Sequence, residues 1–204
     1  MKSSDGHPVV LVLHGPSGVG KDTIVEKLQE KAGIHRPTSS TDRKPRDGEV
    51  AGVDYHFLST EEFKAKIAAG DFIEHADVYG DLKGLERSEL EYALDHGRDV
   101  IIRTDVQGAR RWREMLPDVI TILLVASHEH EPANYRTRLE QRETEDAESF
   151  TRRAADLTED LADSEQNDYV VVNSDGALDA AVDEIIGIIK KERLSGHPLV
   201  RLPS

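Results

Sequence analysis

The sequence predicts a three-layer α/β fold, in which helices cover both faces of a parallel sheet. Short and strongly apolar runs indicate buried strands at residues 9–13, 100–102, 119–125 and 169–172. Each run is followed by apolar residues at helical spacing, and an alternation of strands and helices is typical of a parallel sheet. The first run ends at a glycine-rich turn that leads directly into a helix.

Apolar spacing places the first and last helices of this core. Apolar residues recur at helical spacing over residues 24–32 and stop at Gly33, which favours the end of a helix. Residues 178–189 show the same spacing and predict a closing amphipathic helix. The chain is therefore expected to open with a strand, a glycine turn and a helix, and to close with a helix.

Two polar segments interrupt the alternation, so we expect one core with two insertions. The length of 204 residues suits a single core with appendages. Residues 1–34, 94–133 and 165–204 are assigned to the core, and residues 35–93 to a turn-rich insert. Residues 134–164 are expected to form a helical lid, because two helical stretches meet there at an acidic link that is too charged to be buried.

The insert carries its own local signals. Short strand-like pieces at residues 55–58 and 72–78 lie on either side of a helical stretch. Ser59 predicts the start of that helix, because a glutamate follows it at capping-box spacing. Ser88 has the same spacing and predicts the start of the helix that returns to the core.

The composition excludes several classes of function. The formal net charge of −14 argues against binding to nucleic acid, which needs a basic face. No apolar run approaches the roughly 20 residues that span a bilayer. Because the first residues also lack a signal-peptide pattern, we expect a cytoplasmic protein that does not act at a membrane.

The absence of cysteine excludes disulfides and thiolate metal sites. The sequence carries no signal for an oligomeric state.

The glycine-rich turn has the pattern G-x-x-x-x-G-K of a P-loop, which binds nucleotide phosphates. Its residues are Gly15, Pro16, Ser17, Gly18, Val19, Gly20 and Lys21. The backbone N–H groups of such a turn close around phosphates, while the helix N-terminus and the lysine supply positive potential. The sequence therefore predicts an ATP site, with Mg²⁺ as the ion that accompanies ATP.

One position of this loop departs from the pattern. Asp22 stands where the motif has a serine or threonine that ligates Mg²⁺. Either Asp22 contacts the metal through water, or the hydroxyl of Thr23 takes over part of that role. We include both residues in the predicted ATP site.

Within the insert, residues 39–57 form a long motif: Ser39-Ser40-Thr41-Asp42-Arg43-Lys44-Pro45-Arg46-Asp47-Gly48-Glu49-Val50-Ala51-Gly52-Val53-Asp54-Tyr55-His56-Phe57. This motif resembles the signature of the guanylate kinase family, T-T-R-x-P-R followed by G-E-x-x-G and Y-x-F, with Asp42 in place of a hydroxyl residue. The resemblance runs from about Val9 to Glu192. It implies a P-loop NTPase core, a GMP-binding insert and a lid, in an enzyme of purine nucleotide metabolism that phosphorylates GMP and dGMP with ATP.

The resemblance also implies which residues bind GMP. Arg43, Arg46 and Tyr55 match residues that hold its phosphate, and Ser39 matches one beside the base. Two guanidinium groups and a phenol suit a dianionic phosphate. Glu74 matches the glutamate that reads guanine, since a carboxylate can accept from both N1–H and the 2-amino group, neither of which adenine offers. Position alone would make Glu74 a solvated strand residue.

Two further departures concern the GMP site. The family pattern Y-G-[ST] appears as Lys83-Gly84-Leu85, and D-x-D-x-Q-G appears as Arg103-Thr104-Asp105-Val106-Gln107-Gly108. Lys83 can still donate to phosphate, whereas Leu85 lacks the hydroxyl that contacts the base. Asp105 can accept from Arg43 or hold a metal-bound water. We therefore expect guanine to be read through Glu74, with looser discrimination against other bases.

The resemblance further implies an arginine cluster in the lid. Arg138, Arg142 and Arg153 match arginines that fold over the transferring phosphoryl group, so they are expected to act in catalysis with Lys21. Arg138 and Arg142 lie four residues apart, where like charges repel unless an anion lies between them. Asn173 matches a residue near the adenine ring of ATP, although a plain cap after a strand is an equally good interpretation.

Other assignments remain open at this stage. A ribose 1,5-bisphosphate kinase also carries Lys-Asp at this point of the P-loop, but it would need neither the full insert motif nor Glu74. A catalytically silent guanylate-kinase-like binding module would typically lack a working P-loop.

The run His128-Glu129-His130-Glu131 is expected to be a solvated loop, because its spacing places no pair on one helix face. The protein itself is therefore predicted to have no separate metal site.

Overall fold

A parallel sheet forms the centre of the larger part of the molecule. The structure is a computed structural model that describes residues 6–78, 80–126 and 164–202. The sheet has the strand order β6-β1-β7-β8, with β6 at Val100–Arg103, β1 at Val10–His14, β7 at Ile120–Val125 and β8 at Tyr169–Val172. All of its neighbouring strands are parallel. The predicted strands are confirmed, although β1 and β6 each end one residue later than predicted and β1 and β7 each begin one residue later.

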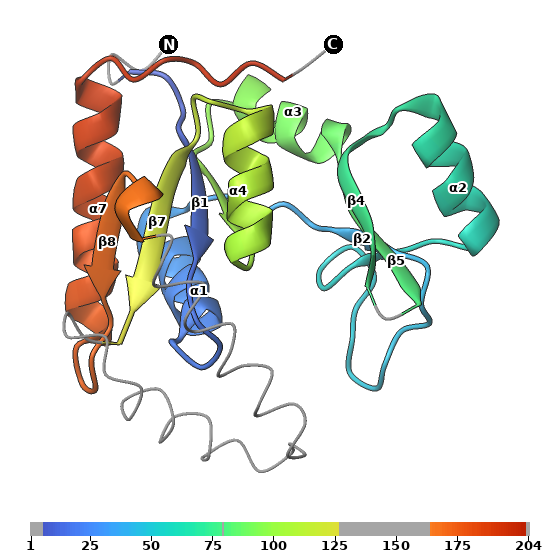
Figure 1. Ribbon diagram of the computed structural model, residues 1–204, viewed down its shortest axis with the longest axis horizontal. Helices are drawn as coiled ribbons and strands as arrows, with labels where there is room; N and C mark the ends of the chain where they lie inside the picture. Colours follow the sequence, from blue (N-terminus) through green and yellow to red (C-terminus); the bar gives the residue numbers. More distant parts are fainter. Residues whose placement is uncertain (1–5, 79, 127–163, 203–204) are drawn as a thin grey trace.

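Helices cover both faces of this sheet, which confirms the three-layer fold (Figure 1). One face packs against α1 (Lys21–Ala32) and α7 (Leu178–Leu194), and the other against α4 (Val106–Met115) and α3 (Arg87–Asp95). Alternate side chains of β1 serve the two faces: Leu11 joins the cluster under α1, and Val12 the cluster under α4. Burial on both faces explains why the sequence of β1 is continuously apolar.

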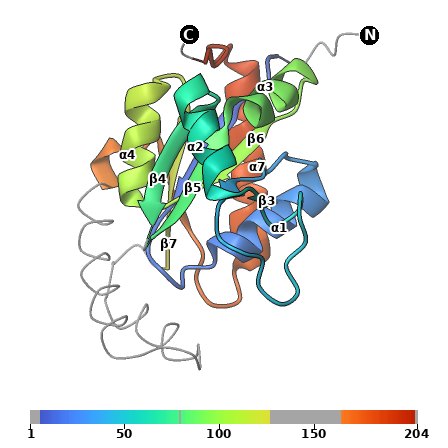
Figure 2. The ribbon, with the colours of Figure 1, turned by 90° about the vertical axis from the view of Figure 1, so that its right-hand side faces the viewer.

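The insert folds around a smaller sheet of strand order β3-β2-β5-β4. Its strands are β2 (Ser40–Thr41), β3 (His56–Phe57), β4 (Phe72–Val78) and β5 (Asp81–Glu86), and α2 (Thr60–Ala69) packs on them. Phe63 of α2 stacks on Phe72, with 4.4 Å between the ring centroids. Ser59 and Glu62 form the predicted capping box of α2. Figure 2 shows this sheet in front of the parallel sheet.

The prediction for the start of α3 is wrong. The helix begins at Arg87, with Glu86 rather than Ser88 at the cap position and no side-chain hydrogen bond to cap it. The reason is β5, which the sequence analysis did not predict. This strand pairs with both β2 and β4 and runs directly into α3, so the helix starts where the strand stops.

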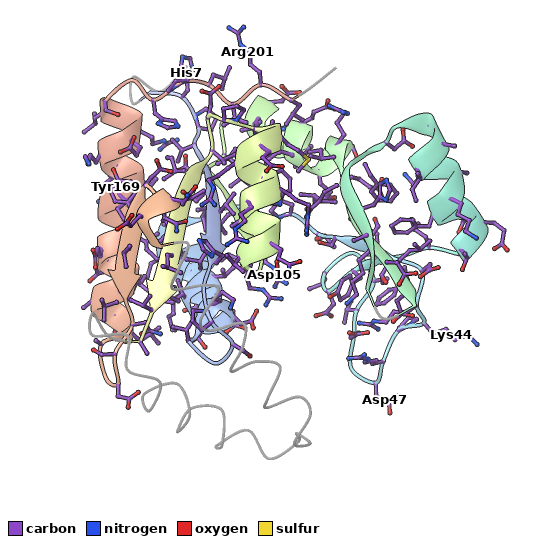
Figure 3. The ribbon with its side chains drawn as sticks, in the orientation of Figure 1. His7, Lys44, Asp47, Asp105, Tyr169 and Arg201 are labelled. Atoms are coloured by element: carbon purple, nitrogen blue, oxygen red, sulfur yellow. The ribbon has the colours of Figure 1, made fainter. Side chains whose placement is uncertain are left out.

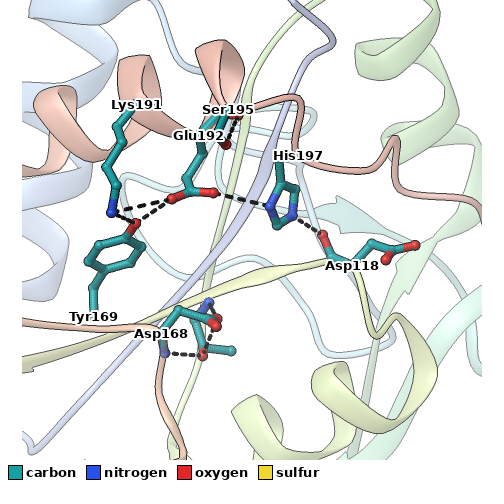
Figure 4. A network of polar contacts seen from close by, with 8 residues as sticks. Asp118, Asp168, Tyr169, Lys191, Glu192, Ser195 and His197 are labelled. Carbon is teal, nitrogen blue, oxygen red and sulfur yellow. Dashed lines mark hydrogen bonds and ion pairs between the residues drawn. The ribbon is translucent and has the colours of Figure 1, made fainter.

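The C-terminal segment is held to the core by a polar network (Figure 4). Tyr169 of β8 donates to Glu192 of α7 and accepts from Lys191 at 2.8 Å. His197 contacts Glu192 at 3.2 Å and the carbonyl oxygen of Asp118 at 2.8 Å. These contacts fix the end of α7 and lead the chain across the sheet, where Val200 is buried.

None of the helices in the described part of the chain combines the length and the apolar character that crossing a membrane requires.

The glycine of β5 provides a test of the packing in the insert. A Cβ added at Gly84 would lie 2.7 Å from Phe72 Cδ1 and 2.8 Å from the backbone oxygen of Glu74. We expect Gly84→Ala to lower the free energy of unfolding by about 1–3 kcal/mol through overpacking, measured by urea denaturation.

Gly187 is the matched control, because a Cβ there meets nothing within 4 Å. Gly187→Ala lies inside α7 and is expected to raise the unfolding free energy by about 0.5–1 kcal/mol. Equal effects of the two alanines would show that the close approach at Gly84 does not constrain the insert.

Candidate active site

The predicted phosphate loop has the backbone that its glycines allow. It lies between β1 and α1, and Gly15 and Gly20 have φ angles of 139° and 96°. A Cβ on Gly15 would lie 2.2 Å from the carbonyl oxygen of Leu124, so only glycine fits there. The Lys21 ammonium lies over the same turn, where it donates to the carbonyl oxygens of Gly15 and, at 3.0 Å, Pro16. The loop and its lysine are thus assembled at the N-terminus of α1.

Asn173 supports this loop from the neighbouring strand end. Its side chain is 6% exposed, and Nδ2 donates to the carbonyl oxygen of Val19 at 2.8 Å. Its backbone N–H donates to Val125 at 2.8 Å, which continues the β7–β8 pairing. The residue matched to the adenine site therefore packs against the loop and helps to fix its shape.

Asp22 contacts another residue that departs from the family pattern. The Asp22 carboxylate lies in the first turn of α1, and its Oδ1 is 3.0 Å from Nε of Arg103. Arg103 is the last residue of β6 and is in register with Leu13 of β1, just before the loop. Thr23 is exposed on the first turn of α1. Sequence reasoning noted both departures but had no signal that the two side chains meet.

A cavity of about 550 Å³ lies between the parallel sheet and the insert. Five of the predicted GMP residues line it: Ser39, Tyr55, Glu74, Lys83 and Asp105. Four of them come from the insert and Asp105 comes from the core, which also supplies Arg103 and Thr104. Figure 3 shows Asp105 at the end of α4, on the side of the core that faces the insert.

Glu74 is a partly buried carboxylate in the wall of this cavity. Its side chain is 26% exposed, and burial raises its pKa above the ordinary value for a glutamate, while the charge of Arg111 acts in the opposite direction. Nε of Arg111 lies 4.0 Å from the Glu74 carboxylate. Arg111 was missed in the sequence analysis, although its place on the helix after Gly108 was a usable signal. A partly buried carboxylate that faces a cavity and has a raised pKa is a candidate for binding a ligand.

Arg43 and Arg46 lie next to the cavity rather than in its wall. The guanidinium of Arg43 forms two hydrogen bonds with Glu49, at 2.6 and 2.5 Å, and lies 5.0 Å from the centre of the Tyr55 ring. Glu49 also accepts from the backbone N–H of Arg46, at 2.8 Å. The hydrogen bonds from Arg43 are the main reason why the pKa of Glu49 falls to about 2. Glu49 is therefore the anion that Arg43 binds in this structure.

Asp42 and Asp105, which the sequence analysis compared with the family pattern, both form hydrogen bonds that support the fold. Asp42 accepts from the Thr60 hydroxyl at 2.8 Å and from the backbone N–H of Leu82 at 2.7 Å, so it joins α2 to β5. Asp105 caps α4 by accepting from the backbone N–H of Gly108 at 2.7 Å. The departure at Asp42 thus serves the fold of the insert, and Asp105 has a capping role besides its place in the cavity wall.

The lid assigned to residues 134–164, with Arg138, Arg142 and Arg153, lies outside the described residues apart from its last position, as does the loop at His128–Glu131.

Comparison with known proteins places this arrangement in a family. The family model described as guanylate kinase matches residues 7–192. The chain belongs to the guanylate kinase family. A guanylate kinase from Symbiobacterium thermophilum is 41% identical over 186 residues, which cover 91% of this chain and 86% of that protein. Guanylate kinase 2, chloroplastic/mitochondrial, from Oryza sativa subsp. japonica is 40% identical over 192 residues, which cover 93% of this chain and 66% of the rice protein.

A solved structure of the guanylate kinase family has the same fold. The crystal structure of guanylate kinase from Anaplasma phagocytophilum superposes with a TM-score of 0.69 at 31% sequence identity. The match covers 93% of this chain and 88% of that one. The fold shared with the guanylate kinase family therefore includes both the parallel sheet and the insert.

The contact between Asn173 and the loop can be tested directly. Asn173→Asp keeps the size of the side chain but replaces the donor with an oxygen that faces the Val19 carbonyl. We expect the free energy of unfolding to fall by about 1–3 kcal/mol, measured by thermal or urea denaturation, and the affinity for ATP to fall with it. Asn173→Ala removes the amide without this repulsion and should be milder, whereas unchanged stability in both variants would rule out a supporting role.

Proposed function

We propose that this chain is a guanylate kinase, which transfers the γ-phosphoryl group of ATP to a phosphate oxygen of GMP or dGMP. One P–O bond forms on the acceptor phosphate, the β–γ bridge of ATP breaks, and GDP (or dGDP) and ADP are released. The observation that carries the proposal is the cavity, whose wall contains the partly buried Glu74 carboxylate and also Arg103, which contacts Asp22 just after the phosphate loop. Membership of the guanylate kinase family supports the same activity.

Glu74 is proposed to read the base. An ionised carboxylate offers two acceptor oxygens to the N1–H and 2-amino donors of guanine. Adenine would leave the desolvated carboxylate without these donors, which costs far more than a lost contact in water. Leu85 is 4% exposed and packs in the core cluster under α4. Since it offers no hydroxyl to the base, guanine recognition in this proposal depends on Glu74.

The phosphate of GMP is proposed to bind at the Tyr55 side of the cavity. Lys83 lies 6.0 Å from the centre of the Tyr55 ring and Arg43 lies 5.0 Å from it, so both cations flank the phenol. A dianionic phosphate would compete with Glu49 for the guanidinium of Arg43, and Arg46 adds positive charge nearby. Ser39 lines the same cavity and is proposed to lie beside the base.

ATP is proposed to bind at the phosphate loop. The backbone N–H groups of Ser17 to Gly20 and the N-terminus of α1 would hold its β- and γ-phosphates, with Lys21 neutralising their charge. Phosphoryl transfer has a loose transition state, so catalysis needs positioning and charge neutralisation rather than a nucleophilic side chain. Arg138, Arg142 and Arg153 are proposed, from the resemblance alone, to add charge on the γ-phosphoryl group.

The residues beside the loop are compatible with Mg²⁺. This ion is usually held by one or two carboxylates together with substrate phosphates and water. Asp22 supplies a carboxylate beside the loop, and its side chain is 55% exposed, so it has room for a further partner. When bound with ATP, Mg²⁺ would neutralise charge on the phosphates. Asp22 is therefore the proposed metal-side ligand, with Thr23 on the same turn of α1.

Replacing the loop lysine tests the activity. We expect Lys21→Ala to lower kcat by about a hundredfold or more, in an assay that couples ADP release from ATP and GMP to a spectroscopic signal. Lys27→Ala is the matched control, because Lys27 lies on the same helix and pairs with Glu30 on the surface at 2.6 Å. Near-normal turnover of Lys21→Ala at saturating substrate would remove the proposed role of the loop.

The pH dependence of kcat/KM for GMP tests the role of Glu74. Only the ionised carboxylate can accept both donors of guanine, so binding is complete above the pKa of Glu74 and is lost as the pH falls through it. Because burial raises this pKa, the loss should begin at a higher pH than for an ordinary glutamate. Arg111→Gln removes a charge that opposes the rise and should move the acid limb to still higher pH.

Titration of the GMP phosphate is common to all variants, so the comparison isolates the enzyme group. Glu74→Gln should lose most activity with GMP and no longer show this acid limb. A panel of GMP, dGMP, IMP and AMP completes the test, with equal rates for GMP and AMP as the result that would eliminate guanine recognition.

A further inference from the structure

The two residues that break the phosphate-site pattern form a pair with each other. Asp22 replaces the hydroxyl residue after the loop lysine, and Arg103 replaces the first acid of the D-x-D-x-Q-G pattern. They lie far apart in the sequence, yet Arg103 Nε and Asp22 Oδ1 are 3.0 Å apart. The register of β6 with β1 brings Arg103 beside the end of β1, and the loop returns Asp22 to the same place.

The pair changes the net charge that the pattern predicts at these two positions from −1 to 0. A hydroxyl and a carboxylate would carry one negative charge together, whereas Asp22 and Arg103 carry none. An unpaired Asp22 carboxylate would lie in the helix turn that receives a polyphosphate, where like charges at about 5 Å repel appreciably even near a protein surface. The adjacent guanidinium of Arg103 neutralises the charge of the Asp22 carboxylate.

We propose that Asp22 and Arg103 act as one unit that sets the charge of the ATP phosphate site. Arg103 is a positioning residue: its guanidinium holds the Asp22 carboxylate through Oδ1 and neutralises it, which permits the loop to accept polyphosphate. The second carboxylate oxygen is left for the hydrated metal ion that accompanies ATP. This inference rests on the ATP half of the proposed function and does not depend on which acceptor is phosphorylated.

The place of Arg103 distinguishes this pair from an ordinary surface ion pair. Arg103 also lines the cavity, next to Thr104 and Asp105, so its side chain lies between the proposed sites of the two nucleotides. Surface pairs typically contribute little because water and salt screen them. The side chains of Arg103 and Asp22 are 35% and 55% exposed, so their substitution should leave the fold intact and report on the ligand.

The test is a double-mutant cycle on nucleotide binding. The affinity for ATP is measured by calorimetry, without GMP, for Asp22→Ser, Arg103→Met and the double variant, first in EDTA and then in Mg²⁺. In EDTA we expect Arg103→Met to weaken ATP binding about tenfold or more, because the Asp22 charge is no longer cancelled. Adding Asp22→Ser to this variant should restore the affinity to within about threefold of the wild type.

The effect of Mg²⁺ on ATP affinity tests the role of Asp22 in the proposed unit. Asp22→Ser should reduce the gain in ATP affinity that Mg²⁺ provides, while Arg103→Lys should retain most of the wild-type behaviour in both solutions. Lys31→Ala and Asp179→Ala are the matched controls, since this exposed pair joins α1 to α7 at 2.9 Å and should not change ATP affinity. Circular dichroism checks that each variant is folded.

Additive effects of the two substitutions, or ATP affinities in EDTA that equal the wild type, would overturn the proposal. The result is independent of turnover. If the cycle shows coupling but GMP is not phosphorylated, the proposed role of the Asp22–Arg103 pair is supported and GMP is rejected as the acceptor. If GMP is phosphorylated and the cycle shows no coupling, only the pair is rejected.

Discussion

The close passage of the first glycine turn beside the end of β7 is the constraint on which the rest of the site depends. Gly15 leaves β1 with a positive φ angle and meets the Leu124 carbonyl at a distance that excludes any side chain. From that point the loop curls back to α1, and Asn173 fixes it from the end of β8. The position of Lys21, and hence of any bound phosphate, follows from these backbone contacts.

The second feature of the site is its composite wall. The cavity takes Ser39, Tyr55, Glu74 and Lys83 from the insert and Asp105 from the core. Neither sheet alone encloses it. A small substrate held there would contact both parts of the molecule. This placement suits a transfer between two anionic nucleotides, which needs alignment more than reactive side chains.

Local patterns predicted the elements whose residues are governed by near neighbours. The apolar run of β1, the stop at Gly33 and the capping box at Ser59 each depend on contacts within a few residues, and all are present in the structure. Strand β5 was missed because its alternation is weak and its stability comes from pairing with β2 and β4. The misplaced start of α3 followed directly from that omission.

The functional site shows the same difference between features that a sequence pattern predicts and contacts that depend on the whole fold. The resemblance to a family predicted Ser39, Tyr55, Glu74, Lys83 and Asp105 as site residues, and in the structure all of them line one cavity. The partners of the charged groups could not be read from the sequence. Three pairings are specified only by the folded chain: Arg43 with Glu49, Arg111 with Glu74 and Arg103 with Asp22.

The pairing of Arg43 with Glu49 has a consequence for selectivity. The guanidinium is already satisfied by an internal anion, so in the proposed enzyme a substrate must displace that carboxylate rather than occupy an empty position. Such an exchange sets a threshold: a weakly coordinating monoanion, such as chloride, gains too little to replace two short hydrogen bonds, whereas a phosphomonoester dianion gains enough. An internal competitor of this kind would keep the site closed to the abundant simple salts of a cell.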